Sequence, residues 1–210
     1  MAETAPMSGR KAQAARNDKL ILEAARAVFV ADPSAPIAAV AERAGVGISA
    51  LYRRYPSKED LLRKLASDGL RLYISVAEAA LADEGDPWES FARFMHGIVD
   101  ADTNAITRNL AGMFKPDEGL YQDAMRAYEL NVRIMERTRA AEVIRPGVEI
   151  ADLALIAEQL SAIKLGDEER SRELRRRYLT LILDSLRNPP ATSPLPGPAP
   201  TDEELSRRWG

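Results

Sequence analysis

Five side chains in one short stretch could bind a nucleic acid: Ser49, Tyr52, Arg53, Arg54 and Lys58. An arginine can pair with a phosphate or donate two hydrogen bonds to a guanine edge, and hydroxyl and ammonium groups can donate to phosphates. A solvent-exposed helix face carries similar residues, so their position in the fold decides between the two interpretations.

Residues 36–58 predict the elements that would position these side chains. Apolar residues at helical spacing predict a short helix over 37–44 and another over 48–55, with the turn Gly45-Val46-Gly47 between them. Gly45 can take the positive φ that a sharp turn after a helix requires. Two short helices joined in this way are typical of a helix-turn-helix, whose second helix enters the major groove of DNA.

The flanking segments add further candidates. Ser57-Lys58-Glu59-Asp60 resembles a capping box and predicts a long helix from there to about Ala82. Lys58 then lies in the first turn, where an anion is favoured. Arg10, Lys11 and Arg16 lie on a predicted flexible arm and could reach the DNA backbone or minor groove.

These motifs together resemble the DNA-binding domain of the TetR family. The resemblance rests on AERAGV at 41–46, on LYxxYPSKExL at 51–61 and on ILEAAxxxF at 21–29. It implies a three-helix DNA-binding head, a long fourth helix and a helical regulatory body. It also implies a homodimer that binds a palindromic operator on double-stranded DNA, usually represses, and is released by a small-molecule effector.

The resemblance assigns roles to single residues. It implies that Tyr52 and Lys58 contact phosphates, while the residues around them face bases or phosphates. Ala35 and Pro36 stand where the family often has a serine or threonine cap, so one phosphate contact is not expected here. The full set of candidate DNA-binding residues is Gly47, Ile48, Ser49, Tyr52, Arg53, Arg54, Tyr55, Lys58, Arg10, Lys11 and Arg16.

The chain as a whole predicts an all-α fold, because apolar residues recur at three and four and no alternating strand pattern is present. We expect a flexible basic arm over 1–16, a helix-turn-helix domain over 17–64 with its first helix starting near Asn17, and a helical regulatory and dimerisation domain over 65–188. Body helices are expected near 88–101, 104–113, 118–142, 149–164 and 168–187. A proline-rich tail follows over 189–210.

The body contains aromatic and methionine stripes, which are usually core packing but also suit an adaptable ligand pocket. The candidate pocket residues are Phe91, Met95, Ile98, Met113, Tyr121, Met125 and Tyr128. The last two helices have apolar surfaces wider than one stripe, which predicts a second neighbour such as the same helices of another subunit. The candidate interface residues are Leu153, Ala157, Leu160, Tyr178, Leu181 and Ile182.

Charge and composition limit the alternatives. Residues 1–64 hold 11 Lys and Arg against 7 Asp and Glu, whereas residues 65–210 hold 18 against 25, so a basic head precedes an acidic body. The absence of cysteine and a single histidine argue against a metal site, and no membrane-spanning stretch or signal peptide is visible, so we expect a cytoplasmic protein without a cofactor. A helical protein-interaction adaptor without DNA binding and a helical enzyme remain the alternatives; no catalytic residues are identified.

Overall fold

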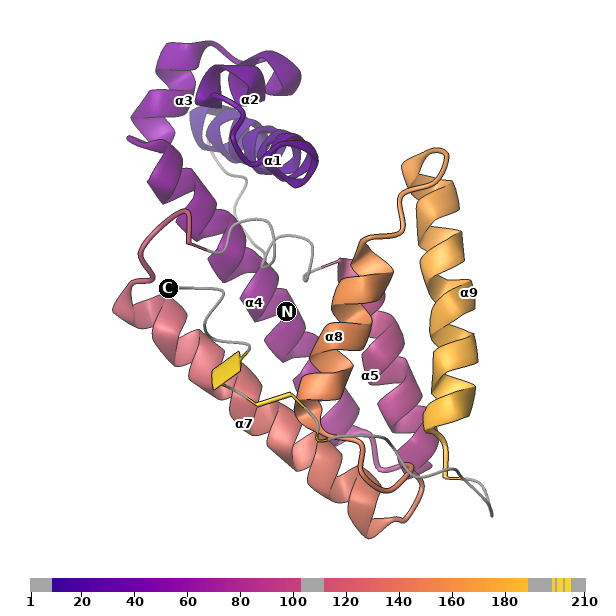
Figure 1. Cartoon of the computed structure of the whole chain (residues 1–210). Coiled ribbons are helices and arrows are strands. Elements are labelled where there is room, and N and C mark those ends of the chain that lie inside the picture. The colour runs from indigo at the N-terminus through magenta and orange to yellow at the C-terminus, as the bar shows by residue number, and fades with distance from the viewer. Residues whose placement is uncertain (1–8, 103–111, 189–197, 199, 202, 205–210) are drawn as a thin grey trace. The chain divides into compact units, whose positions relative to one another are not determined.

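The computed structural model describes residues 9–102, 112–188, 198, 200–201 and 203–204, and within them the chain is helical. The predicted all-α class is confirmed: no strand occurs in these ranges, where a single antiparallel bridge joins Ile144 to Arg187. The predicted helix at 104–113 and the proline-rich tail lie largely outside the described residues. The helices, shown in Figure 1, are α1 (Gly9–Ala31), α2 (Ile37–Ala44), α3 (Ile48–Arg54), α4 (Lys58–Ala82), α5 (Pro87–Ala101), α7 (Glu118–Ala140), α8 (Ile150–Ser161) and α9 (Glu168–Leu186).

The chain divides into two compact units, Met1–Leu65 and Ala66–Gly210. The division falls inside α4, next to the boundary that the sequence predicts after residue 64. We call these units the head and the body and describe each by itself.

The head is a three-helix arrangement closed by the first turns of α4. Ile21, Ala25 and Phe29 lie on one face of α1 and are buried, as their helical spacing predicts. Val40 of α2 and Leu51 of α3 are fully buried. Leu61 and Leu62 at the start of α4 are also buried and complete this core.

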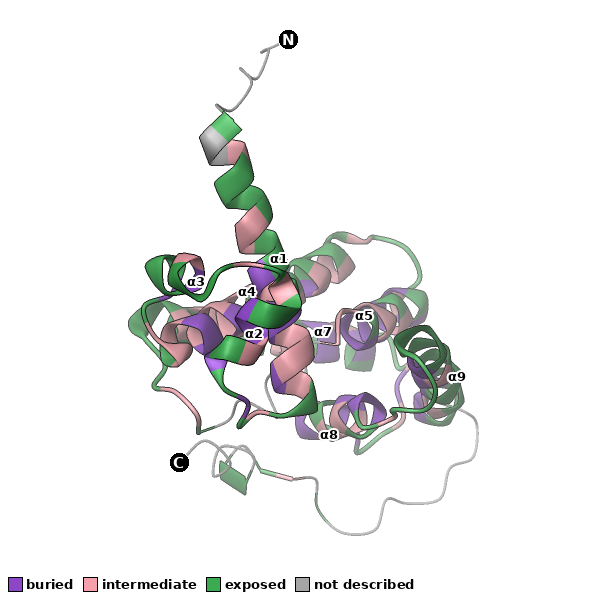
Figure 2. Ribbon diagram, turned by 90° about the horizontal axis from the view of Figure 1, so that it is seen from above, coloured by how far each residue is buried: buried purple, intermediate pink, exposed green. Residues whose placement is uncertain are grey.

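Helix α1 begins at Gly9, well before the start predicted at Asn17. Asn17 therefore lies inside the helix and does not cap it, and its side-chain oxygen accepts a hydrogen bond from Gln13 one turn earlier, at 2.9 Å. Alanine, arginine, lysine and glutamine have high helix propensity, and they extend the helix through a segment that has no apolar face. Figure 2 shows this N-terminal part of α1 as largely exposed. Residues 9–16 are therefore helical, and the side chains of Arg10 and Lys11 lie outside the described set.

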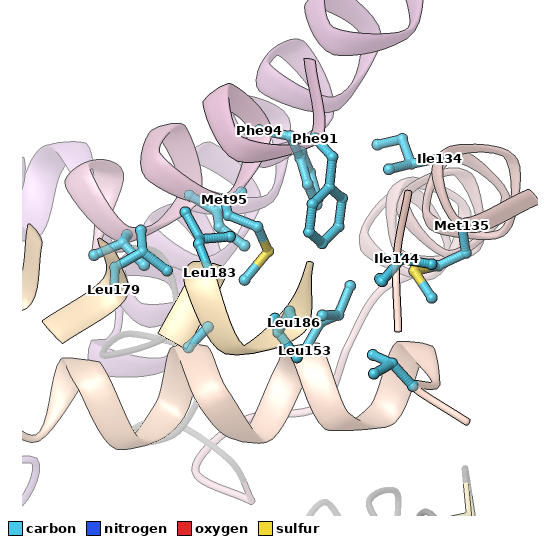
Figure 3. Close-up of a cluster of buried hydrophobic side chains, with 14 of the residues drawn as sticks. Phe91, Phe94, Met95, Ile134, Met135, Ile144, Leu153, Leu179, Leu183 and Leu186 are labelled. Carbon is cyan, nitrogen blue, oxygen red and sulfur yellow. The ribbon is translucent and has the colours of Figure 1, made fainter. Parts of the chain in front are cut away.

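The body is built around α5, whose buried face is apolar except for Ser90. Phe91, Phe94 and Met95 are buried against residues of α7, α8 and α9. Figure 3 shows these side chains pointing toward Leu153, Leu179 and several neighbours from the other helices. The ring of Phe94 also meets Tyr73 of α4 edge-on, with centroids 5.8 Å apart. The aromatic stripe of α5 thus forms the core of the body.

Candidate nucleic-acid interface

The turn between α2 and α3 has the geometry that the sequence predicts. Gly45 has φ 65° and ψ 31°, which is the left-handed conformation. The N–H of Val46 donates to the carbonyl of Ala41 at 3.0 Å and that of Gly45 to Glu42 at 3.1 Å, which together form a Schellman motif. A side chain at Gly45 would strain this turn, so the glycine is required for the angle between the two helices.

Helix α3 buries one side and exposes the other. Leu51 and Tyr55 point into the head, with 0% and 5% of their surface exposed. The opposite side, which we call the free face, consists of Ile48, Ser49, Tyr52 and Arg53, all exposed. No hydrogen bond or ion pair holds the side chains of the free face among the residues that the structure describes. Two large apolar side chains on this face, Ile48 and Tyr52, are 40% and 46% exposed.

Arg54 does not share the free face but turns back toward α1. Its Nε and Nη2 atoms donate to the two carboxylate oxygens of Asp18, at 2.7 Å and 3.0 Å. The hydroxyl of Tyr55 donates to the same carboxylate at 2.7 Å. The structure thus gives adjacent arginines different surroundings: Arg53 faces outward and Arg54 is paired within the head.

The electrostatics of Asp18 follow from this pairing. The hydrogen bond from Arg54, helped by that from Tyr55, holds the pKa of Asp18 below its ordinary value, although partial burial acts in the opposite direction. The same contact raises the pKa of Arg54. Asp18 therefore stays charged at neutral pH, and the pair persists until the pH falls well into the acidic range.

Lys58 is also occupied within the head. Its Nζ atom donates to the carbonyls of Pro33 and Ala35, at 2.9 Å and 2.8 Å, and lies 4.9 Å from the ring centroid of Phe29. These contacts tie the first turn of α4 to the loop after α1. A phosphate at Lys58 would have to compete with two carbonyl groups and an aromatic ring.

These contacts predict that Lys58→Met destabilises the folded protein by about 1–2 kcal/mol, because two carbonyls lose a charged donor. Thermal or urea unfolding of the full chain measures this change. Lys19→Met, which removes the same charge from the exposed side of α1, where Lys19 lies 3.7 Å from Glu23, is the control. Wild-type stability of Lys58→Met combined with weakened DNA binding would instead mean that the ammonium group reaches a phosphate in the complex.

The structure does not bring the seven predicted pocket residues together. Phe91, Met95 and Ile98 are buried in the core of the body, whereas Met113 is half-buried after the undescribed segment. The three residues from α7 are exposed on its outer side: Tyr121, Met125 and Tyr128.

A small cavity lies elsewhere in the body and includes only Ile98 of that set. Its volume is about 60 Å³, and it is lined by Tyr73, Ile98, Asn131, Ile150, Leu153, Ala154 and Ala157. The hydroxyl of Tyr73 donates to the side-chain oxygen of Asn131 at 2.7 Å, and burial raises the pKa of Tyr73 to about 12. The cavity is therefore mostly apolar with one polar pair in its wall.

The predicted interface residues also separate into two groups. Leu153, Ala157 and Leu160 of α8 are buried in the core of their own chain. Tyr178 and Leu181 of α9 are 47% and 56% exposed, and Ile182 is half-buried. An apolar surface thus remains on the outer side of α9.

Sequence reasoning missed Asp18 altogether. Asp18 and Arg54 are 36 positions apart, and no motif connects them. The one available signal was an acidic residue within a basic segment of the chain. In the parts of the chain that the structure describes, no group of three potential metal ligands is present, and no helix is long and apolar enough to cross a membrane.

The head also has known relatives. The family model of the bacterial regulatory proteins of the TetR family matches residues 21–65. The transcriptional repressor LfrR of Mycolicibacterium smegmatis is 45% identical over 51 residues, which are 24% of this chain and 27% of the repressor. The chain belongs to the TetR family. This confirms the family predicted from the helix-turn-helix motifs.

Solved TetR-family structures extend the likeness to the body. A TetR transcription regulatory protein from Mycobacterium vanbaalenii is 26% identical, with a TM-score of 0.55 over 85% of this chain and 99% of the other. The structure of LfrR from Mycobacterium smegmatis in complex with proflavine is 23% identical, with a TM-score of 0.59 over 81% of this chain and 96% of the other, and shows a common fold. Membership of a family of regulatory proteins supports a regulator over an enzyme.

Proposed function

We propose that this TetR-family protein is a transcriptional repressor that reads double-stranded DNA through the free face of α3. One observation carries the proposal: the polar side chains on the outward side of α3 have no partner among the described residues. The Schellman turn before α3 sets the direction of this short helix. A helix of this kind fits the major groove, which is about 12 Å wide. A repressor acting on the chromosome works in the cytoplasm, where we place it.

The chemistry of the free face suits mixed contacts. Arg53 can donate two hydrogen bonds to a guanine, and Ser49 and the hydroxyl of Tyr52 can donate to bases or phosphates. Ile48 is an exposed apolar residue with no role in the head core, and it can contact a thymine methyl group. The resemblance between the head and that of LfrR, a repressor, supports repression.

Binding selection from a random-sequence duplex library with the full chain tests the proposal. We expect a palindrome whose half-sites lie about 34–36 Å apart, or a wider spacing if the heads separate. Arg53→Ala should weaken binding to the enriched duplex by about 1–3 kcal/mol and relax the preference at one base pair. Arg172→Ala, which removes an exposed charge from the body, should leave that preference intact. Recovery of no enriched sequence would count against DNA reading and favour a protein-interaction adaptor.

A palindrome requires two heads, and we propose that the outer side of α9 forms the dimer contact, with α8 packed behind it. The support is the outer side of α9, where Tyr178 and Leu181 are exposed although they are large and apolar. The predicted α8 residues, which are buried, would then pack beneath α9 and would not contact the partner subunit. A protein that sediments as a monomer at micromolar concentration would contradict this proposal.

We further propose that a small-molecule effector binds the body at the cavity between Tyr73, Asn131 and Ala157. The polar pair could orient a mostly apolar compound. A volume of about 60 Å³ is well below the roughly 300 Å³ of an ordinary ligand pocket, so binding must widen the cavity. Ala157→Leu should fill it. Library compounds that raise the melting temperature of the wild type should then leave the melting temperature of this variant unchanged. An equal rise in both proteins would mean that the effector binds elsewhere.

A further inference from the structure

A carboxylate of α1 is joined by hydrogen bonds to the end of α3. Asp18 accepts two hydrogen bonds from Arg54 and one from Tyr55, the residues at which α3 ends. Bidentate pairs of arginine and carboxylate are directional contacts, and this one is shielded from water mainly on the side of Asp18, whose side chain is 21% exposed against 58% for Arg54. The carboxylate therefore sets the position and the orientation of the end of α3.

The apolar packing of α3 in the head comes mainly from two residues. Leu51 is the buried residue within α3, and the remaining apolar anchor is Tyr55 just after it. A cavity of about 130 Å³ remains between α1 and α3, lined by Ala14, Asn17, Asp18, Ile21, Val46, Ala50, Arg53 and Arg54. Because this space is not filled, the two helices are not locked by interdigitating side chains at this point. The polar contact is what spans the gap.

We propose that Asp18 is the positioning residue of DNA recognition, which holds Arg54 out of the DNA interface and fixes the angle of the free face of α3. This inference rests on the proposed function. It assigns different roles to two neighbouring arginines: Arg53 reads DNA, whereas Arg54 orients the helix through Asp18. It also means that a negatively charged residue of the head favours sequence-specific binding to DNA, which is itself negatively charged.

Charge alone predicts the opposite effect of removing Asp18. Loss of a negative charge from the head should strengthen binding to any duplex, and a released Arg54 could neutralise one more phosphate. Loss of the fixed helix angle should weaken discrimination between sequences, because base contacts depend on direction. The ratio of sequence-specific to non-specific affinity therefore separates positioning from electrostatics.

The experiment compares Asp18→Ala, Arg54→Ala and the double variant with a charge control, Glu42→Ala. Glu42 is an exposed acidic residue of α2 whose loss changes the charge of the head by the same amount. Affinities are measured at several salt concentrations for the duplex enriched by selection and for a random-sequence duplex. Asp18→Asn, which keeps an oxygen acceptor, serves as the milder variant if the alanine variant unfolds near the assay temperature.

We expect Asp18→Ala to bind the random duplex more tightly, with a salt slope steeper by about one unit. Its ratio of enriched to random affinity should fall about tenfold, within the range of one lost base contact. The steeper slope should vanish when Arg54 is also replaced. Glu42→Ala should leave the ratio unchanged. An unchanged ratio in Asp18→Ala, or a slope reduced by one unit in Arg54→Ala alone, would overturn the proposal.

Hydrogen exchange of the α3 amides tests the same contact without DNA. Exchange should become faster by about tenfold or more in Asp18→Ala and less so in Asp18→Asn, since opening of α3 costs less free energy once its end is released. If the exchange rates of the α3 amides were the same in Asp18→Ala and the wild type, the positioning role would be wrong even if DNA binding is confirmed. A wild type that binds no duplex would remove the proposed function, while the exchange result would still decide whether Asp18 anchors α3.

Discussion

Arg175→Met should destabilise the protein by about 1.5–3 kcal/mol, the range for hydrogen bonds to charged groups, because its partners Glu168 and Asp102 are 65% and 15% exposed. The Arg175 side chain is 3% exposed and lies 3.1 Å from a carboxylate oxygen of Glu168 and 3.7 Å from one of Asp102. Its Nε atom also donates to the carbonyl of Ile163 at 3.3 Å. Methionine has a similar length but no charge, so the nearly buried carboxylate of Asp102 would lose its cation. Urea unfolding of the full chain measures the change.

The next residue in the chain provides the control. Arg176 makes two hydrogen bonds to Asp100, at 2.6 Å and 2.9 Å, yet its side chain is 55% exposed. Arg176→Met should therefore cost about 0–1 kcal/mol, because water screens the pair. Adding Asp102→Asn to Arg175→Met should recover part of the loss, since residue 102 then carries no charge beside the missing guanidinium. Equal effects of the two arginine substitutions would contradict the assignment of the loss to burial.

Gly97→Ala should destabilise the body by about 1–3 kcal/mol, the usual cost of an overpacked contact. A Cβ atom at Gly97 of α5 would lie 2.5 Å from the Cγ1 atom of Val76 on α4. This is too short for any van der Waals contact, and Val76 is branched at Cβ and stiff, so one helix has to shift. The expected readout is a lower midpoint of thermal or urea unfolding.

A second helical glycine distinguishes this clash from an effect of helix propensity. At Gly119 of α7, the nearest atom to an added Cβ is Oδ1 of Asp117 at 3.6 Å, which is an ordinary contact. Gly119→Ala should be neutral or stabilising by up to about 1 kcal/mol. Combining Gly97→Ala with Val76→Ala should restore most of the stability, and no recovery in that double variant would rule out the close approach as the cause.

Local sequence determined most of the head. The spacing of apolar residues predicted the buried faces of α1, α2 and α3, and Gly45 predicted the turn. Both features depend on residues within a few positions of each other. The first residues of α5, α7 and α9 were also predictable from the local sequence. Asp86, Asp117 and Asp167 each accept a hydrogen bond from the backbone N–H three residues later, as helix caps do.

The same local reasoning was wrong about the start of α1. It weighted one capping residue, Asn17, above the summed helix propensity of the residues before it. It also assigned Arg54 and Lys58 to the DNA-binding surface from their residue types and their positions in the motif. Lys58 and Arg54 are polar and on or beside helices, yet both are engaged within the head.

The sequence alone therefore determined that this protein is an all-α member of its family, with a helix-turn-helix in its first third. Which polar residues of that motif have a side-chain partner within the head was decided by the tertiary structure. Asp18 and Arg54 are 36 positions apart, and so are not neighbours by any helical period. The folding of α1 against α3 brings them together, and only then does Arg54 gain a partner within the head, whereas Arg53 has none among the described residues.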